Sequence, residues 1–419
     1  MSGRAEADPS ETAGDVVFTN VRVFDGRQVL HGTDTVRVAG GLITELGGEG
    51  RGRPGEQVVD GSGATLLPGL IDAHTHVSAG RLEQALVLGV TTELDMFADP
   101  AVAADYRVRA ASDASVADLR SAGTGATVAG GHPTQLVDRG FYRPFPLVEN
   151  STDPQRFVVD RQAEGSDYLK VFVDDGGVVG FPHPSLRGDQ VKALVDAAHR
   201  RGMLAVAHVA TCADVVTAVN AGVDVLGHVP TDNPLRDQVV DQIAALSIAV
   251  IPTLGVNRAV CGCGDGPQVA ANPHLQPYLD QTSVMMLTMM GGNFPIGSAA
   301  KLRPDPDAAP ASVRSLHERG VTLLAGSDAG TLGVAHGATL HDELRLLVEA
   351  GLTPSDALAA ATSNPARVFT LPDRGRIIVG ALADLVLVNG DPTTDIAATR
   401  NIAGVWRGGQ QATRARYDR

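Results

Sequence analysis

Cysteine and aromatic residues are scarce in this chain of 419 residues, which has three cysteines and only 4% aromatic residues. Three cysteines are too few for a disulfide framework in a chain of this length. Cys261 and Cys263 are close enough in sequence to suggest a metal pair, but a single Cys-x-Cys in a glycine-rich loop favours free thiols. With so few rings, the core must consist mainly of Ala, Val, Leu and Ile, as in parallel sheets covered by helices.

The chain also lacks long apolar runs and basic clusters. No run approaches about 18 consecutive apolar residues, which argues against a membrane span. The net charge is −14, and no basic run is longer than the short scatter of Arg414, Arg416 and Arg419, so we expect no nucleic-acid surface. Residues 1–14 are polar and lack the basic start and apolar stretch of a signal peptide. We therefore predict a flexible tail there and a cytoplasmic protein.

Two separated segments have the pattern of β-strands. Residues 15–65 and 373–419 both contain short alternating apolar runs that are divided by glycine-rich turns. The simplest arrangement is one small β-sandwich built from both ends of the chain, with the middle of the chain inserted between them.

The middle of the chain, residues 66–372, alternates short apolar runs with stretches of helical periodicity, which is typical of repeated βα units. Eight such units in succession predict an α/β fold, a (β/α)₈ TIM-like barrel of parallel strands. The strand candidates are Leu70–Asp72, Val90–Asp95, Asp118–Ser121, Tyr168–Val173, Leu204–His208, Val225–His228, Ile248–Thr253 and Val321–Asp328.

One connection, residues 255–311, is too long for an ordinary loop and predicts a lid-like insertion. Four methionines, at positions 285, 286, 289 and 290, repeat there at helical spacing. They either pack this helix onto the barrel or form an adaptable apolar wall for a substrate.

The ends of the predicted strands carry an unusual set of polar residues. Active sites of such barrels lie at the carboxyl ends of the strands. There the chain offers six side chains able to bind a metal: His74, His76, Lys170, His208, His228 and Asp328. Each alone has an ordinary structural explanation, but their coincidence at one face predicts a metal site. The histidines at 31, 183, 199, 274, 317 and 341 fall on loops or helices, where we expect solvated or hydrogen-bonded side chains.

Three motifs resemble those of the amidohydrolase superfamily. Residues 67–76, Leu-Pro-Gly-Leu-Ile-Asp-Ala-His-Thr-His, are similar to its opening motif, and 326–330, Gly-Ser-Asp-Ala-Gly, to its strand-eight aspartate. Residues 362–366, followed by Gly375 and residues 380–386, resemble the return into the small β-sandwich. The resemblance covers nearly the whole chain beyond residue 15, and it implies a metal-dependent hydrolase.

Lys170 points to a subtype within this superfamily. A bare ammonium is a poor ligand, whereas a lysine that has reacted with CO₂ is a carbamate that can bridge two cations. With His208 and His228, this resembles the prolidase and imidazolonepropionase-like branch with a carbamylated lysine and a binuclear site. The resemblance implies two divalent ions, for which zinc is suited, with His74, His76, Lys170 and Asp328 on one and Lys170, His208 and His228 on the other.

The implied reaction is hydrolysis of an amide-type C–N bond in a small molecule: a dipeptide or N-acyl amino acid, a urea or a carbamate. A metal-bridging hydroxide would attack the carbonyl carbon, with Asp328 as general base and then acid. His132, Tyr142 and His336 are the candidates for substrate binding, whereas Arg143 and Arg258 are by default surface arginines. We expect a homo-oligomer, as is common for such barrels.

Two other functions stay open. One is a mononuclear deaminase of the same superfamily, although the position where such enzymes carry Glu, three residues after the strand-five His, is Thr211. The other is a non-catalytic scaffold homologue, although such a protein would be expected to lose ligands. The number of bound metals separates the three alternatives.

Overall fold

The computed structural model describes residues 14–295, 297 and 304–417. Nearly all of the tail predicted at 1–14, and part of the insertion predicted at 255–311, lie outside the described residues. Among the helices that are described, none combines the length and the apolar character that crossing a membrane requires.

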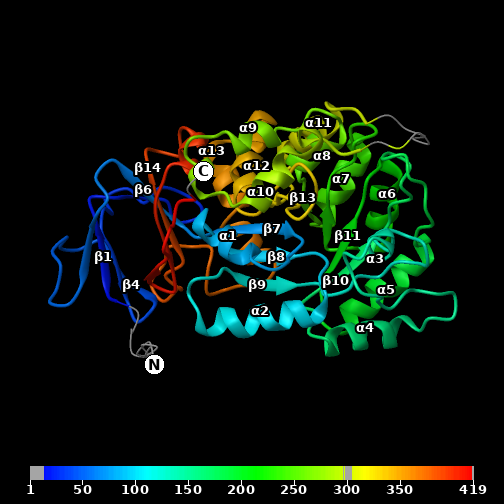
Figure 1. Ribbon diagram of the computed structural model, residues 1–419, viewed down its shortest axis with the longest axis horizontal. Helices are drawn as coiled ribbons and strands as arrows, with labels where there is room; N and C mark the ends of the chain where they lie inside the picture. The colour runs from blue at the N-terminus through cyan, green and yellow to red at the C-terminus, as the bar shows by residue number, and fades with distance from the viewer. Residues whose placement is uncertain (1–13, 296, 298–303, 418–419) are drawn as a thin grey trace, which may run out of the picture.

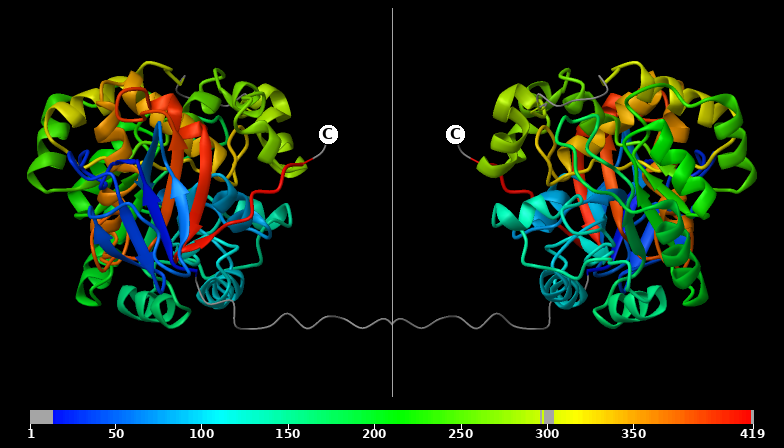
Figure 2. Two further views of the ribbon diagram at one scale, coloured as in Figure 1. Left: turned by 90° about the vertical axis from the view of Figure 1, so that its left-hand side faces the viewer. Right: turned by 90° about the vertical axis from the view of Figure 1, so that its right-hand side faces the viewer.

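Two β-sheets at one end of the molecule are built from both ends of the chain (Figure 1; Figure 2, left). The first has the order β4-β3-β1-β5 and the second the order β16-β15-β14-β6-β2. Strand β14 pairs antiparallel with β6, which joins the C-terminal segment to the N-terminal one. The strands are β1 Val16–Thr19, β2 Arg22–Val23, β3 Val36–Ala39, β4 Leu42–Leu46, β5 Gln57–Asp60, β6 Ala64–Pro68, β14 Leu385–Asn389, β15 Ile402–Arg407 and β16 Gln410–Gln411.

Residues from both sheets form a single apolar cluster, which includes Phe18 of β1, Leu66 of β6 and Leu387 of β14. Its largest member is Trp406 of β15, whose ring meets the edge of Phe18 with centroids 4.7 Å apart. Because this cluster takes its members from both terminal segments, its burial holds the two segments together.

Seven parallel strands form the centre of the chain, in two sheets. One contains β7 Leu70–Thr75, β8 Val90–Asp95 and β9 Asp118–Ser121, and the other β10 Leu169–Phe172, β11 Ala205–His208, β12 Val225–Gly227 and β13 Ala249–Ile251. Isolated parallel bridges link the edges of these sheets, from Ala126 to Val171, from Val250 to Leu323 and from Thr75 to Ala329. The result is a TIM-barrel-like fold.

The eighth predicted strand, residues 321–328, is an extended segment rather than a regular strand. Its backbone nevertheless bonds to both neighbours, because Leu324 N donates to Val250 O at 2.9 Å and Asp328 N donates to His74 O at 2.8 Å. The ladder is interrupted near Gly326, where a Cβ would lie 2.8 Å from that of His74. This close approach brings the segment directly against the end of β7.

Side-chain alternation divides the core into two layers. Val206 of β11 belongs to a cluster with Ile71, Leu94 and Leu324, inside the ring of strands. Its neighbours Ala205 and Ala207 belong to the larger cluster between strands and helices.

The helices pack around the central strands (Figure 1). Their bounds are α1 Arg81–Val87, α2 Pro100–Ser112, α3 Gln135–Asp138, α4 Pro154–Ala163, α5 Gly188–Arg200, α6 Cys212–Ala221, α7 Asp237–Ala245, α8 Leu254–Val260, α9 Gly266–Ala270, α10 Gln281–Thr288, α11 Ala308–Glu318, α12 Ala338–Glu349, α13 Pro354–Ala360 and α14 Ser363–Val368. Short 3₁₀ turns are η1 Gln276–Tyr278, η2 Met289–Gly292 and η3 Ile396–Arg400.

Helix α10 of the long connection packs by Leu287 and Ser283 rather than by its methionines. Met285, Met289 and Met290 are 47%, 39% and 58% exposed, so these three do not pack onto the barrel, whereas Met286 is half-buried. An ion pair also joins the segment to α1, in which Arg81 Nη2 lies 2.7 Å from Asp280 Oδ2.

Candidate metal centre

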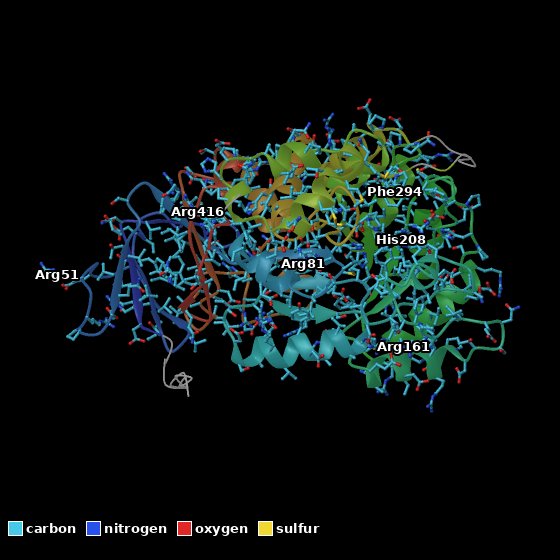
Figure 3. The ribbon with its side chains drawn as sticks, in the orientation of Figure 1. Arg51, Arg81, Arg161, His208, Phe294 and Arg416 are labelled. Atoms are coloured by element: carbon cyan, nitrogen blue, oxygen red, sulfur yellow. The ribbon has the colours of Figure 1, made fainter. Side chains whose placement is uncertain are left out.

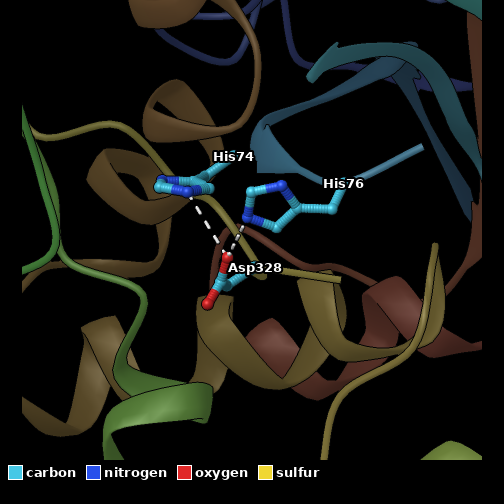
Figure 4. A group of neighbouring side chains, drawn as sticks. All are labelled: His74, His76 and Asp328. Carbon is cyan, nitrogen blue, oxygen red and sulfur yellow. Dashed lines mark ion pairs between the residues drawn. The ribbon is translucent and has the colours of Figure 1, made fainter. Parts of the chain in front are cut away.

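His74, His76 and Asp328 meet at the carboxyl end of β7 (Figure 4). Asp328 Oδ1 lies 3.4 Å from His74 Nε2 and 3.1 Å from His76 Nε2. His74 is fully buried, whereas the side chain of His76 is 21% exposed and gives the group access to solvent. One ligand atom from each residue lies within 4.8 Å of the others, which is close enough for a shared cation.

His208 and His228 form a second pair beside the first group. His228 Nε2 lies 3.0 Å from His208 Nδ1, and the ring of His228 lies 4.6 Å from that of His74. His208 ends β11 and His228 directly follows β12, so neighbouring parallel strands present them at the same edge. Figure 3 places His208 on the side of the molecule away from the terminal sheets.

Lys170 of β10 lies among these five residues. Its side chain is completely buried, and its Nζ has no hydrogen-bond partner. Nζ lies 3.1 Å from the position that a Cβ on Gly227 would take, and His74 Cε1 lies at the same distance from that position. Burial lowers the pKa of the Lys170 amine to about 7, although the charge of Asp328 opposes this change. The structure thus brings the six predicted ligands together.

The buried donor atoms of this group fit a metal centre. Both nitrogens of His74, Nζ of Lys170 and Oδ1 of Asp328 are buried without a hydrogen bond of good geometry. Such atoms are costly to leave unsatisfied, and imidazole and carboxylate donors are those that divalent cations such as zinc prefer. Burial and the nearby cationic groups also hold the pKa of His74 and of His228 well below the usual value, which leaves both imidazoles neutral with a lone pair to share.

The backbone at this edge adopts conformations that side chains rarely allow. His228, Thr253 and Asp328 have φ of 78°, 52° and 58°, in the left-handed region. Such strain persists only where the surrounding structure enforces it, and it concentrates at functional sites. Gly330, at φ 106°, has no room for a side chain, because a Cβ would lie 2.6 Å from His76 O.

A buried carboxylate fastens the two segments that carry the first group. Asp72 Oδ1 accepts hydrogen bonds from the backbone N of His74 at 3.2 Å and of Ser327 at 2.9 Å. Ser327 Oγ donates to Asp72 Oδ2 at 2.6 Å. Burial, and then the charge of Glu93, raise the pKa of Asp72 to about 7. Asp72 therefore ties β7 to the segment that holds Asp328.

Three of the histidines have a partner for the second ring nitrogen. His76 Nδ1 lies 3.4 Å from the carbonyl oxygen of Phe97, and His228 Nδ1 lies 2.6 Å from Thr253 Oγ1. His208 Nε2 lies 3.7 Å from Asp174 Oδ2. Such contacts orient an imidazole and select which nitrogen carries the proton.

The residues predicted to bind substrate have different surroundings. The His132 ring stacks on that of His208, with centroids 5.1 Å apart, so His132 lies beside the predicted metal ligands. The Tyr142 ring packs against Phe97 at 4.9 Å, and burial together with the charges of Asp95 and Asp328 raises the pKa of its hydroxyl. His336 is buried, and its Nδ1 lies 2.9 Å from Glu93 Oε1. Its partner is thus a carboxylate of β8.

Two further residues join this region without having been predicted to do so. Asp174, which follows β10, lies near His208 and also 3.8 Å from His183 Nε2. The His183 ring stacks at 6.1 Å on that of His132, so His183 is not a solvated surface histidine. The position of Asp174 just beyond a strand end was a usable signal, whereas nothing in the sequence distinguishes His183.

Other candidates have structural partners. Arg143 is 85% exposed and lies 3.6 Å from Asp99. Arg258 makes two hydrogen bonds to Asp265, at 2.8 and 3.1 Å. Thr211 caps helix α6, because its side chain accepts a hydrogen bond from Asp214 N.

Known proteins are similar in sequence and in fold. The model of the amidohydrolase family matches residues 65–412. An imidazolonepropionase from Ectopseudomonas mendocina is 25% identical over 423 residues, which cover 90% of this chain and 92% of that protein. An uncharacterised protein of Mycobacterium tuberculosis is 26% identical over 344 residues, or 79% and 80% of the two chains. The solved structure of a Xaa-Pro dipeptidase with bound methionine has a TM-score of 0.73 at 23% identity, over 95% of this chain and 99% of that one.

Proposed function

We propose that this chain, which belongs to the amidohydrolase family, is a metal-dependent hydrolase that cleaves an amide-type C–N bond in a small molecule. The observation that carries the proposal is the convergence of six buried or half-buried side chains, of which His74, Lys170 and Asp328 have buried donor atoms without a hydrogen bond. The proposed architecture is a closed (β/α)₈ barrel at 66–372 with the insertion 255–311, and a composite β-sandwich from 15–65 and 373–419. The homo-oligomer and the cytoplasmic location stay predictions.

Two divalent cations would occupy the site, and its imidazole and carboxylate donors suit zinc. His74, His76 and Asp328 would hold one, and His208 and His228 the other. When bound, such a pair lowers the pKa of a water molecule toward about 7 and stabilises negative charge on a carbonyl oxygen.

Lys170 would join the two positions after reaction with CO₂. The Lys170 amine has a pKa of about 7, so a large fraction of it is neutral and nucleophilic at neutral pH. Attack of the amine on CO₂ forms an N–C bond, and the nitrogen loses a proton, which leaves a carbamate anion. The carbamate would supply oxygen donors in place of an amine that has no partner.

Asp328 is positioned to move the proton. Its Oδ1 faces His74 and His76, which leaves the second carboxylate oxygen free (Figure 4). As water attacks the substrate carbonyl, Asp328 accepts the proton and then donates it to the leaving nitrogen. This transfer is what allows the C–N bond to break without expelling an amide anion.

His132 would bind the substrate carbonyl. Burial and the nearby His208 hold the pKa of His132 well below its usual value, so the ring is neutral. Its Nδ1 lies 2.7 Å from Gln135 Nε2, and an amide N–H that donates there places the ring proton on Nε2. His132 can then donate one hydrogen bond from Nε2.

Aromatic residues indicate the substrate's other groups. Phe97 contacts Tyr142, Phe145 and Phe172 at centroid distances of 4.9, 4.9 and 5.8 Å. The Phe172 ring in turn lies 5.5 Å from that of His208. An apolar wall beside the metal ligands favours a hydrophobic or aromatic group next to the scissile bond.

Metal analysis with a hydrolysis assay tests the proposal. Wild type and Lys170→Ala are purified side by side with bicarbonate, and the metal per chain is measured by plasma emission. We expect about two metals in the wild type, and one or fewer with lost hydrolysis of amides, N-acyl amino acids or ureas in the variant. One metal in both proteins would contradict the binuclear mechanism and favour the deaminase alternative, although Thr211, as the cap of α6, is not a proton shuttle. No metal in the wild type would favour the scaffold alternative.

A further inference from the structure

Thr253 lies in a strained and buried position just beyond β13. It is completely buried, and its φ of 52° is in the left-handed region, which a β-branched residue rarely adopts. The strain must be stabilised by interactions around it, and it places the hydroxyl in a specific direction.

The hydroxyl of Thr253 does not cap helix α8, which begins at the next residue. Thr253 occupies the N-cap position of α8, where a threonine side chain ordinarily accepts a hydrogen bond from the first helical turn, yet it makes no such bond. Glu343 of α12 supplies that acceptor instead, since its Oε2 accepts from Gly255 N at 3.0 Å. The Thr253 hydroxyl is therefore available for another purpose.

The hydrogen bonds around this hydroxyl have one consistent direction. Thr253 Oγ1 lies 2.7 Å from the carbonyl oxygen of Pro252, which also accepts from Asn257 Nδ2 at 3.0 Å. A carbonyl cannot donate, so the single hydroxyl hydrogen goes to Pro252 O. The oxygen's lone pair then faces His228 Nδ1 at 2.6 Å and requires a proton there.

We propose that Thr253 is a positioning residue that holds His228 in the Nδ1–H tautomer and so presents the Nε2 lone pair to the cation position of His208 and His228. This inference rests on the proposed function, because it concerns the metal pair. Nε2 of His228 already faces the second imidazole, 3.0 Å from His208 Nδ1. Without the hydroxyl oxygen, the Nδ1 proton of a metal-bound His228 would be buried without an acceptor.

Loss of the Thr253 hydroxyl should affect the two cation positions differently. Thr253 makes a hydrogen bond to His228, whereas the hydrogen bonds and ion pairs described above for the side chains of His74, His76 and Asp328 are to one another and to Phe97, and Asp72 binds the backbone of His74. Loss of the hydroxyl should therefore weaken the His208–His228 position and leave the other one occupied. Loss of such an outer contact typically lowers metal affinity by about 10- to 100-fold.

The test compares three variants by zinc binding. Thr253→Val keeps the branched shape but removes the hydroxyl, and Thr253→Ser keeps the hydroxyl but removes a methyl group. Thr91→Val is the matched control, because Thr91 is also completely buried and its hydroxyl reaches only the carbonyl of Leu70, at 3.5 Å. Each protein is dialysed against buffered Zn²⁺ over a range of free concentrations, and release to a coloured chelator is timed.

We expect about two zinc ions per chain in wild type, Thr253→Ser and Thr91→Val. In Thr253→Val one of the two should bind about 10- to 100-fold more weakly and leave faster. Equal binding in Thr253→Val and wild type would overturn the inference, and so would equal losses in the Val and Ser variants or in the Thr91 control. A wild type that binds no zinc would instead overturn the proposed function.

Nitrogen NMR gives a second measurement that needs no substitution of Thr253. In zinc-loaded wild type with ¹⁵N-labelled histidine, His228 is assigned by the loss of its signals in His228→Gln. We expect a protonated Nδ1 and an unprotonated Nε2. A proton on Nε2, or a neutral ring that exchanges between the two tautomers, would contradict the role of Thr253 even if Thr253→Val fails to fold.

Discussion

Replacement of Lys170 by Met should stabilise the metal-free protein while it lowers metal binding to one ion per chain or fewer. Met has a similar length and no charge, so it removes the buried amine without opening a large cavity. In the absence of metal and bicarbonate, the amine is completely buried and its Nζ has no partner. The buried amine lowers the free energy of unfolding, so its replacement by Met should raise that free energy.

The magnitude follows from the pKa of Lys170, which burial lowers from 10.5 to about 7. At about 1.4 kcal/mol per pH unit, this sets an upper bound of roughly 5 kcal/mol for the cost at pH 7. Relaxation around the buried charge should reduce the gain to about 2–4 kcal/mol. Because the folded pKa is the lower one, the cost is complete below pH 7 and disappears as the pH rises toward 10.5. The gain should therefore be smaller at pH 9 than at pH 7.

Urea unfolding of chelator-treated protein in bicarbonate-free buffer measures this gain at both pH values. Lys192→Met is the control, because Lys192 is exposed and pairs with Asp196, so its replacement should change stability by less than about 0.5 kcal/mol. A metal-free Lys170→Met protein less stable than wild type by more than about 1 kcal/mol, or a gain that does not depend on pH, would refute the reasoning.

Three other predictions concern the centre and the core beside it. Asp328→Asn should lower kcat by about 10²- to 10⁴-fold, because the variant lacks the proton acceptor. Steady-state kinetics with metal analysis would distinguish this effect from loss of metal, and an unchanged kcat in a metal-loaded variant would exclude Asp328 as the base. Burial raises the pKa of Glu343 to about 8, so its stabilising contribution is complete below pH 4.5 and is lost as the pH rises to 8. Glu343→Gln should thus be more stable than wild type at pH 8, by a few kcal/mol, and about equal at pH 4, and urea midpoints that do not diverge with pH would contradict this. Gly227→Ala would place a Cβ 3.1 Å from His74 Cε1 and from Lys170 Nζ. The substitution should lower the free energy of unfolding, measured with urea, by about 1–3 kcal/mol and should weaken zinc binding. A zinc affinity equal to that of wild type would show that the ligands have room to move.

The regular parts of the fold were predictable because local periodicity reports them. The strand predicted at Val90–Asp95 has those bounds in the structure, as does the one at Asp118–Ser121. The segment 321–328 was less predictable, since its apolar pattern is that of a strand while Gly326 and the left-handed Asp328 interrupt the ladder. Sequence periodicity indicates which residues are buried, whereas backbone irregularity depends on the residues that the segment contacts on neighbouring strands.

The candidate ligands of the centre could be identified from the sequence, and the residues that contact them could not. His74, His76, His208 and His228 stand out because chemically reactive side chains at strand ends meet at one edge of parallel strands. Thr253 does not stand out in the sequence. Its hydroxyl can contact His228 because Glu343, 90 residues later, accepts the hydrogen bond at the start of α8 in its place. His183 was expected to be solvated or hydrogen-bonded, and its Nδ1 does lie 3.2 Å from the carbonyl oxygen of Pro184. Its stacking on His132 was not predictable, because it depends on how the loop after β10 folds back, with His183 N donating to Asp175 O.

The sequence by itself determined the α/β class, the alternation of strands and helices, the two terminal β segments and the six candidate ligands, because these depend on residue type and spacing. Only the tertiary structure decided which atoms face one another. It placed Lys170 without a partner between two groups of ligands, paired His336 with Glu93, and turned the hydroxyl of Thr253 toward His228. The physical reason is that burial and hydrogen-bond direction are set by residues distant in the chain, and these decide which nitrogen carries a proton and which lone pair is free.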